Sequence, residues 1–159
     1  MIQPFLEVVL FLHGLFATFS VVIAVVIAAI ISRGSLSDRS LRGLKVFAIL
    51  FVALSLAVNL TGASGYIFYR LPSADSPRSL ILKTAPFAHE IFFETMEYVA
   101  LIGPIWSTVI AWTIFHHGER TTVDPELRRM ILLFTILFVA WMIAVAYTGL
   151  IPTMIAPVG

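Results

Sequence analysis

The sequence contains no cysteine and few charged residues, and both deficits restrict the classes of protein to which it can belong. Without cysteine, the 159-residue chain can form neither a disulfide nor a thiolate metal site. Charged residues make up only 12% of the chain, and a formal net charge of +1 provides no basic surface for nucleic acid. Phosphate-binding loops, nucleophile triads and metalloprotease motifs are also missing from the sequence.

Long uncharged runs make up most of the sequence. Hydrophobic residues account for 60% of the chain and the mean hydropathy is +1.01, values that exclude a soluble domain of this size. Uncharged stretches cover residues 8–32, 46–69, 98–118 and 130–159, and each is long enough to cross a hydrocarbon core of about 30 Å. The sequence therefore predicts an all-α integral membrane protein, a four-transmembrane-helix bundle embedded in a lipid bilayer.

Basic residues are distributed unevenly among the expected loops. The first and third loops hold seven of them and the second loop holds three: Arg33, Arg39, Arg42, Lys45, Arg120, Arg128 and Arg129 against Arg70, Arg78 and Lys83. Short loops rich in lysine and arginine stay on the cytoplasmic side. We therefore expect a protein of the cell or inner membrane with both termini outside, and the lack of basic residues before the first apolar run indicates no cleaved signal peptide.

The two halves of the chain resemble each other. At a constant shift of 87, residues 1–72 and 88–159 share 19 identities, ten of them within residues 47–62. Ser37 and Asp124 align at the same shift, and both are placed as helix N-caps, the second followed by Pro125. We expect a single domain, 1–159, built from two tandem two-helix repeats, with residues 73–87 as linker and a pseudo-twofold axis along the membrane normal.

Acidic residues interrupt the start of the third apolar segment. Glu90, Glu94 and Glu97, just after His89, fall within about 60° of one another on an α-helix and form one acidic stripe. Membrane segments rarely keep carboxylates without a partner, a cavity or a cargo, so the stripe is a candidate functional site. In the alternative interpretation the acids stand in the headgroup zone, because residues 98–115 alone are long enough to span.

The repeat also indicates the depth of each residue. Residues 87 apart should lie level, which places Glu7 beside Glu94 and His13 one turn deeper than Glu97. We therefore expect His13 and Glu97 to meet directly or through one ion or water. The expected metal ligands are His13, Glu7, Glu90, Glu94 and Glu97, a set that suits Fe, Mn, Zn or Cu(II). Gly103 and Pro104 predict a kink below this site.

One short motif carries a family resemblance. Leu12-His13-Gly14 in the first span, with His89 near the start of the third, resembles the small four-helix b-haem membrane proteins of the cytochrome b561-type and CopD-like groups. The resemblance implies electron transfer, with haem b held by His13 and His89. Those groups place their ligands at one level, whereas the repeat puts His89 roughly 16 Å above His13.

These features predict a small membrane subunit that binds a metal ion or a redox cofactor, haem or quinol, at an outward-facing His/Glu site. A respiratory or oxidative membrane complex is the expected setting, with other membrane subunits or a second copy of the chain as partners. The short loops leave no room for a substrate domain, so we do not expect an enzyme that acts alone. Two alternatives stay open: a proton- or metal-coupled transporter, and a non-catalytic structural subunit of a larger complex.

Overall fold

The computed structural model describes residues 2–34 and 36–155, and this part of the chain is helical with short connections and no strand. Four of its helical stretches are long and apolar enough to cross a membrane: Pro4–Ser32, Asp38–Tyr69, Ala88–His117 and Pro125–Ile151. Each contains a long apolar stretch, and its charged residues lie toward one end. The predicted all-α, four-helix membrane bundle is confirmed.

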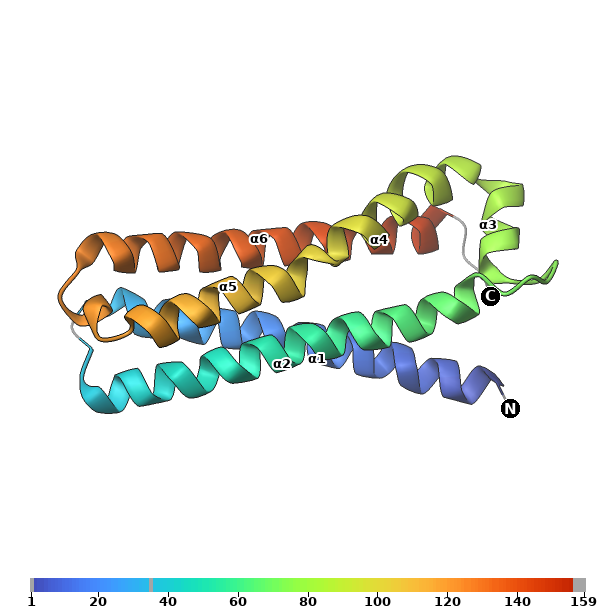
Figure 1. Cartoon of the computed structure of the whole chain (residues 1–159). Helices are drawn as coiled ribbons and strands as arrows, with labels where there is room; N and C mark the ends of the chain where they lie inside the picture. Colours follow the sequence, from blue (N-terminus) through green and yellow to red (C-terminus); the bar gives the residue numbers. More distant parts are fainter. Residues whose placement is uncertain (1, 35, 156–159) are drawn as a thin grey trace.

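The elements run α1 (Ile2–Ser32), α2 (Asp38–Tyr69), α3 (Pro77–Thr84), the π-helix η1 (Ala88–Phe93), α4 (Glu94–Ala100), α5 (Ile102–His117), the 3₁₀ turn η2 (Arg120–Thr122) and α6 (Pro125–Ile155). The start of α1, the end of α2, α3 and the end of α6 lie at one end of the bundle, here called the α3 end (Figure 1). The loops at 33–37 and 118–124 lie at the other, which carries seven of the ten basic residues and is called the basic end.

Hydrogen-bonded caps fix where the helices begin at the basic end. The Ser37 hydroxyl accepts from the Ser40 amide at 3.2 Å, and the Asp124 carboxylate accepts from the amides of Glu126 and Leu127 at 3.0 and 3.1 Å. Each cap satisfies backbone amides that have no partner within the helix, so both predicted N-caps are confirmed. Arg128 then joins the two loops by donating to the carbonyls of Gly34 and Thr122.

The core lies in the half of the bundle next to the basic end. Phe51 of α2 and Phe138 of α6 meet edge to face with ring centroids 4.6 Å apart, and both side chains are fully buried. These residues are 87 apart in sequence. Seven pairs at this shift are buried on both sides: Ser20/Ser107, Ala24/Ala111, Ile27/Ile114, Ile31/Gly118, Leu44/Ile131, Ala48/Thr135 and Phe51/Phe138. A duplicated hairpin predicts such matched burial, and the repeat itself stays a prediction that superposition of the two halves tests.

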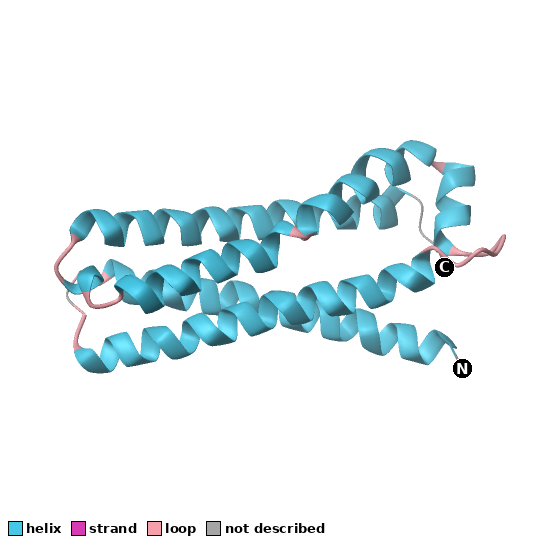
Figure 2. Ribbon diagram, in the orientation of Figure 1, coloured by secondary structure: helices cyan, strands magenta, loops and turns pink. Residues whose placement is uncertain are grey.

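The third span departs from the first. Residues 2–32 form one helix, whereas residues 88–117 divide into η1, α4 and α5, with a short non-helical step at Leu101 (Figure 2). Pro104 has no amide hydrogen to donate to the Ala100 carbonyl, which is where the regular helix stops. The expected kink is therefore present. Trp141 of α6 packs against Gly103, whose added Cβ would lie only 2.8 Å from the indole Cη2.

The contact at Gly103 yields a prediction about stability. Gly103→Ala should lower the free energy of unfolding by about 1–3 kcal/mol, because the new methyl group displaces the Trp141 ring. Gly14→Ala is the matched control, since nothing lies within 4 Å of its added Cβ and alanine favours a helix. Unfolding in detergent micelles measures both; equal stability of the two variants would contradict the proposed close contact.

Candidate functional site

Polar and aromatic side chains gather at the α3 end, where α2, α3, η1 and α4 converge. Tyr66, Tyr69 and Arg70 are spaced i, i+3 and i+4, so they share one face of α2 and point toward η1 and α4. The group, here called the polar cluster, comprises Tyr66, Tyr69, Arg70, Arg78, His89, Phe93, Glu94 and Glu97.

Two glutamates of α4 are held by residues of α2. The Tyr66 hydroxyl donates to Oε2 of Glu97, and Nη2 of Arg70 lies 3.3 Å from the same oxygen and 3.8 Å from Oε1 of Glu94. The Arg70 guanidinium also lies 4.7 Å from the centre of the Tyr66 ring. Because these three charged side chains are 31–42% exposed, each ion pair adds less than about 1 kcal/mol to stability. The carboxylates are therefore accessible from outside the bundle.

His89 is the most enclosed polar residue of the cluster, with 1% of its surface exposed. Its Nε2 lies 3.2 Å from Nε of Arg78, and its Nδ1 lies 2.9 Å from the Tyr69 hydroxyl. Arginine can only donate, so Nε2 must accept, which places the single hydrogen of the neutral imidazole on Nδ1, where it is donated to Tyr69. Both ring nitrogens are thus occupied by protein partners.

The Glu94 carboxylate lies beside the Nε2 atom of His89. Oε1 of Glu94 lies 3.6 Å from Nε2 of His89, the nitrogen that accepts from Arg78. A protonated His89 carries hydrogen on both nitrogens and can no longer accept from Arg78. It would instead favour Glu94 as an ion-pair partner. The two protonation states of His89 therefore have different partners.

An aromatic stack lines the polar cluster. The Phe93 ring lies nearly parallel to that of Tyr69, with centroids 4.0 Å apart, and nearly parallel to that of Tyr66 at 6.1 Å. Stacked aromatic rings bury a large apolar area in a fixed geometry. The cluster thus combines carboxylate acceptors, a neutral imidazole and stacked aromatic rings.

His13 lies apart from the glutamates, against α2. Its Nδ1 is 3.0 Å from the Val58 carbonyl and 3.3 Å from the Thr61 hydroxyl, and its ring fills the space left by Gly62, where a Cβ would lie 3.1 Å from Cε1. In the part of the chain that the structure describes, no hydrogen bond or ion pair joins His13 directly to Glu97. The two residues thus form no direct hydrogen bond, and their approach through one ion or water stays a prediction.

The other predicted ligands are also not brought together. Glu7 and Glu90 are exposed, and neither forms an ion pair within residues 2–34 and 36–155. Across the same residues, no group of three or more His, Asp or Glu side chains is placed to hold a metal ion. Glu90 leaves the predicted stripe because it lies in a π-helix, whose i→i+5 hydrogen bonds change the angular spacing. The expected five-residue metal set is therefore not assembled here.

Four residues of the polar cluster were not among the predicted site residues: Tyr66, Tyr69, Arg70 and Arg78. Their signal was present in part, since the first three share one helix face beside the second loop. The π-helix left no comparable signal, and it is what places His89 next to Arg78. π-turns within helices occur frequently at functional sites.

Comparison with known proteins yields no match: no family model matches the chain, and neither does any curated protein or solved structure. The function must therefore be argued from the polar cluster itself.

Removal of one hydroxyl tests the hydrogen-bonding of His89. Tyr69→Phe should lower the free energy of unfolding by about 1–3 kcal/mol, because the buried Nδ1 hydrogen of His89 loses its acceptor. Tyr98→Phe removes a hydroxyl from a tyrosine that is 71% exposed and should change stability by less than about 0.5 kcal/mol. Unfolding in detergent compares the two variants, and a silent Tyr69→Phe would rule out the assigned hydrogen bond.

Proposed function

We propose that this integral membrane protein is a small subunit of a respiratory or oxidative membrane complex and that its polar cluster binds the headgroup of a quinol. The observation that carries the proposal is the position of His89, a buried neutral imidazole between Arg78 and Glu94, beside a stack of aromatic rings. A quinol headgroup is a planar ring with two hydroxyls. It requires a surface for stacking and acceptors for its hydrogens, and the cluster offers both.

The place of the polar cluster in the membrane supports a lipid-soluble ligand. The third span begins at Ala88, so His89 and the glutamates lie where the hydrocarbon core meets the headgroups. Phe87 and Ile91 flank His89 and are 47% and 57% exposed, as expected for side chains that face lipid. A ligand with an apolar tail and a polar ring can therefore reach the cluster from the bilayer.

Proton handling is the second element of the proposal. A quinol supplies two electrons and two protons when it is oxidised. Among the residues of this chain, Glu97 and Glu94 are placed to accept hydrogen bonds from the hydroxyls, and His89 can take up a proton by exchanging Arg78 for Glu94 as partner. We assign to this chain the binding of the ring and the acceptance of hydrogen bonds from its two hydroxyls.

Binding of a short-tailed quinol to the purified protein in nanodiscs tests the proposal. Glu97→Gln keeps the side-chain volume and removes the charged acceptor, so the dissociation constant should rise by about tenfold or more. Glu126→Gln is the matched control, because its carboxylate belongs to an exposed ion pair at the basic end. Absence of saturable quinol binding to the unaltered protein would overturn the proposal and favour a structural subunit.

A second candidate, haem b, is favoured by one observation on His13. The Val58 carbonyl 3.0 Å from Nδ1 fixes the hydrogen on that nitrogen and leaves the Nε2 lone pair available, the usual state of an imidazole that binds a metal. This supports the resemblance to cytochrome b561-type proteins for His13. It does not support His89 as the second ligand, since both of its nitrogens are occupied. A visible absorption band in the purified protein that His13→Leu removes would favour haem over quinol.

A transporter is less well supported. Transport needs a polar path through both halves of the bundle. The core next to the basic end is formed mainly by aliphatic and aromatic side chains such as Ile27, Phe51 and Phe138. Its buried hydroxyls bond to one another or to carbonyls of their own helix: Ser20, Ser55, Ser107 and Thr135. The polar cluster opens only at the α3 end.

We further propose that the α3 end faces outside and the basic end faces the cytoplasm, because short loops rich in Lys and Arg remain inside. Ser73→Cys and Glu119→Cys each introduce the only thiol of the chain at an exposed position, one at each end. An impermeant thiol reagent added to intact cells should label position 73 and not position 119. The reverse pattern would invert the topology.

A further inference from the structure

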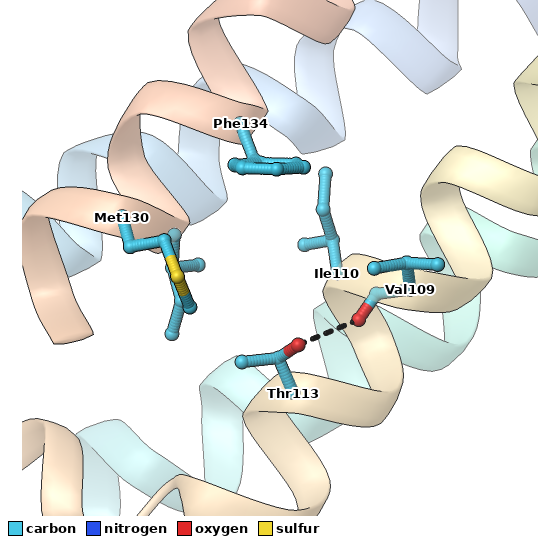
Figure 3. A pocket seen from close by; sticks show the side chains of 6 residues that line it. Val109, Ile110, Thr113, Met130 and Phe134 are labelled. Atoms are coloured by element: carbon cyan, nitrogen blue, oxygen red, sulfur yellow. Dashed lines mark hydrogen bonds between the residues drawn. The ribbon is translucent and has the colours of Figure 1, made fainter.

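A groove between α5 and α6 lies in the half of the bundle next to the basic end. It is lined by Ile110 and Ile131, which are both 2% exposed, and by Val109, Thr113, Met130 and Phe134. Figure 3 shows Met130 and Phe134 of α6 facing Val109, Ile110 and Thr113 of α5. The volume is about 190 Å³. An apolar cavity of about 150 Å³ holds a benzene-sized molecule, so this groove can take a segment of hydrocarbon chain.

The lining of the groove selects an apolar occupant. Five of its six side chains are hydrocarbon or thioether, and the hydroxyl of Thr113 already donates to the Val109 carbonyl at 2.8 Å (Figure 3). No polar atom of the lining therefore lacks a partner. Because Val109, Met130 and Phe134 are 41–47% exposed on helices that span the membrane, the groove opens toward lipid.

The charge around the groove selects the kind of lipid. One helical turn beyond Thr113 and Met130, toward the basic end, lie His117 and Glu126. Arg120 follows His117 in the next turn, and Arg129, the residue before Met130, reaches toward the basic end with Nη1 3.0 Å from Oε1 of Glu126. Arg120 is exposed and forms no ion pair within the residues that the structure describes, while Arg129 pairs only with the exposed Glu126. Exposed arginines at the level of the headgroups attract anionic phospholipids.

We propose that the groove between α5 and α6 binds one acyl chain of an anionic phospholipid, with the phosphate of its headgroup held by Arg120 and Arg129. The chain lies on Ile110 and Ile131 between Val109 and Phe134, and the headgroup sits at the basic end. This site is at the opposite end of the bundle from the polar cluster, so it is independent of the quinol proposal.

Native mass spectrometry of the detergent-purified protein tests the site with two probes of equal chain length, dioleoylphosphatidylglycerol and dioleoylphosphatidylcholine. The anionic lipid should be retained more strongly. Arg120→Gln and Arg129→Gln should each reduce that preference by about fivefold, whereas Lys83→Gln at the α3 end should leave it unchanged. An equal affinity for the two lipids would overturn the headgroup assignment.

A second pair of variants tests the groove itself. Val109→Trp fills the groove from an exposed wall position and should reduce the binding of both lipids, whereas Leu60→Trp, at a lipid-facing position of α2 that is 69% exposed, should not. Met130→Trp fills the groove from the other wall and serves if Val109→Trp fails to fold. Unchanged lipid binding in the groove variants would refute the site. A dimer that Val109→Trp converts to a monomer would also refute it, because a helix of a second copy would then be the occupant.

Discussion

The contact between the last turn of α2 and the segment formed by η1 and α4 organises the α3 end of the molecule. A bilayer provides few partners for polar groups, so carboxylates and imidazoles near the hydrocarbon must be satisfied by the protein itself. Tyr66 and Arg70 satisfy the glutamates of α4, and Tyr69 satisfies His89. η1 and α4 pack against α6, and these bonds join them in addition to the end of α2.

The two ends of the bundle differ in how their helices pack and in how regular those helices are. Near the basic end, helices pack through matched positions such as Phe51 and Phe138, and the resulting core is rigid and apolar. Near the α3 end, the π-helix and the step at Leu101 replace the continuous helix seen in the first half of the chain. If the two halves arose by duplication, the second half lost its continuous helix in the segment where Glu94 contacts Arg70 and His89 contacts Tyr69. This is the pattern expected when a local rule is broken at a functional site.

Sequence reasoning predicted the class, the spans, the caps at Ser37 and Asp124 and the kink before Pro104, because hydropathy and local hydrogen bonding determine them. It also identified the segment containing His89, Glu94 and Glu97. It assigned the wrong partners, however, since it assumed a regular 100° spacing from Glu90 to Glu97. The π-helix and the choice of α2 rather than α1 as neighbour depend on tertiary packing, which a single sequence does not specify.

The hydrogen bonds of His89 determine what can bind to its ring nitrogens. A metal ligand must offer a lone pair, and both nitrogens of His89 are already occupied, so cation binding there would have to break a buried hydrogen bond. Proton uptake at Nε2 breaks the same bond, because the lone pair that accepts from Arg78 is the one that binds the proton, and the Glu94 carboxylate 3.6 Å away would then be the ion-pair partner. Metal binding and protonation at Nε2 therefore both require the Arg78 guanidinium to move away. Arg78 thus controls access to this imidazole.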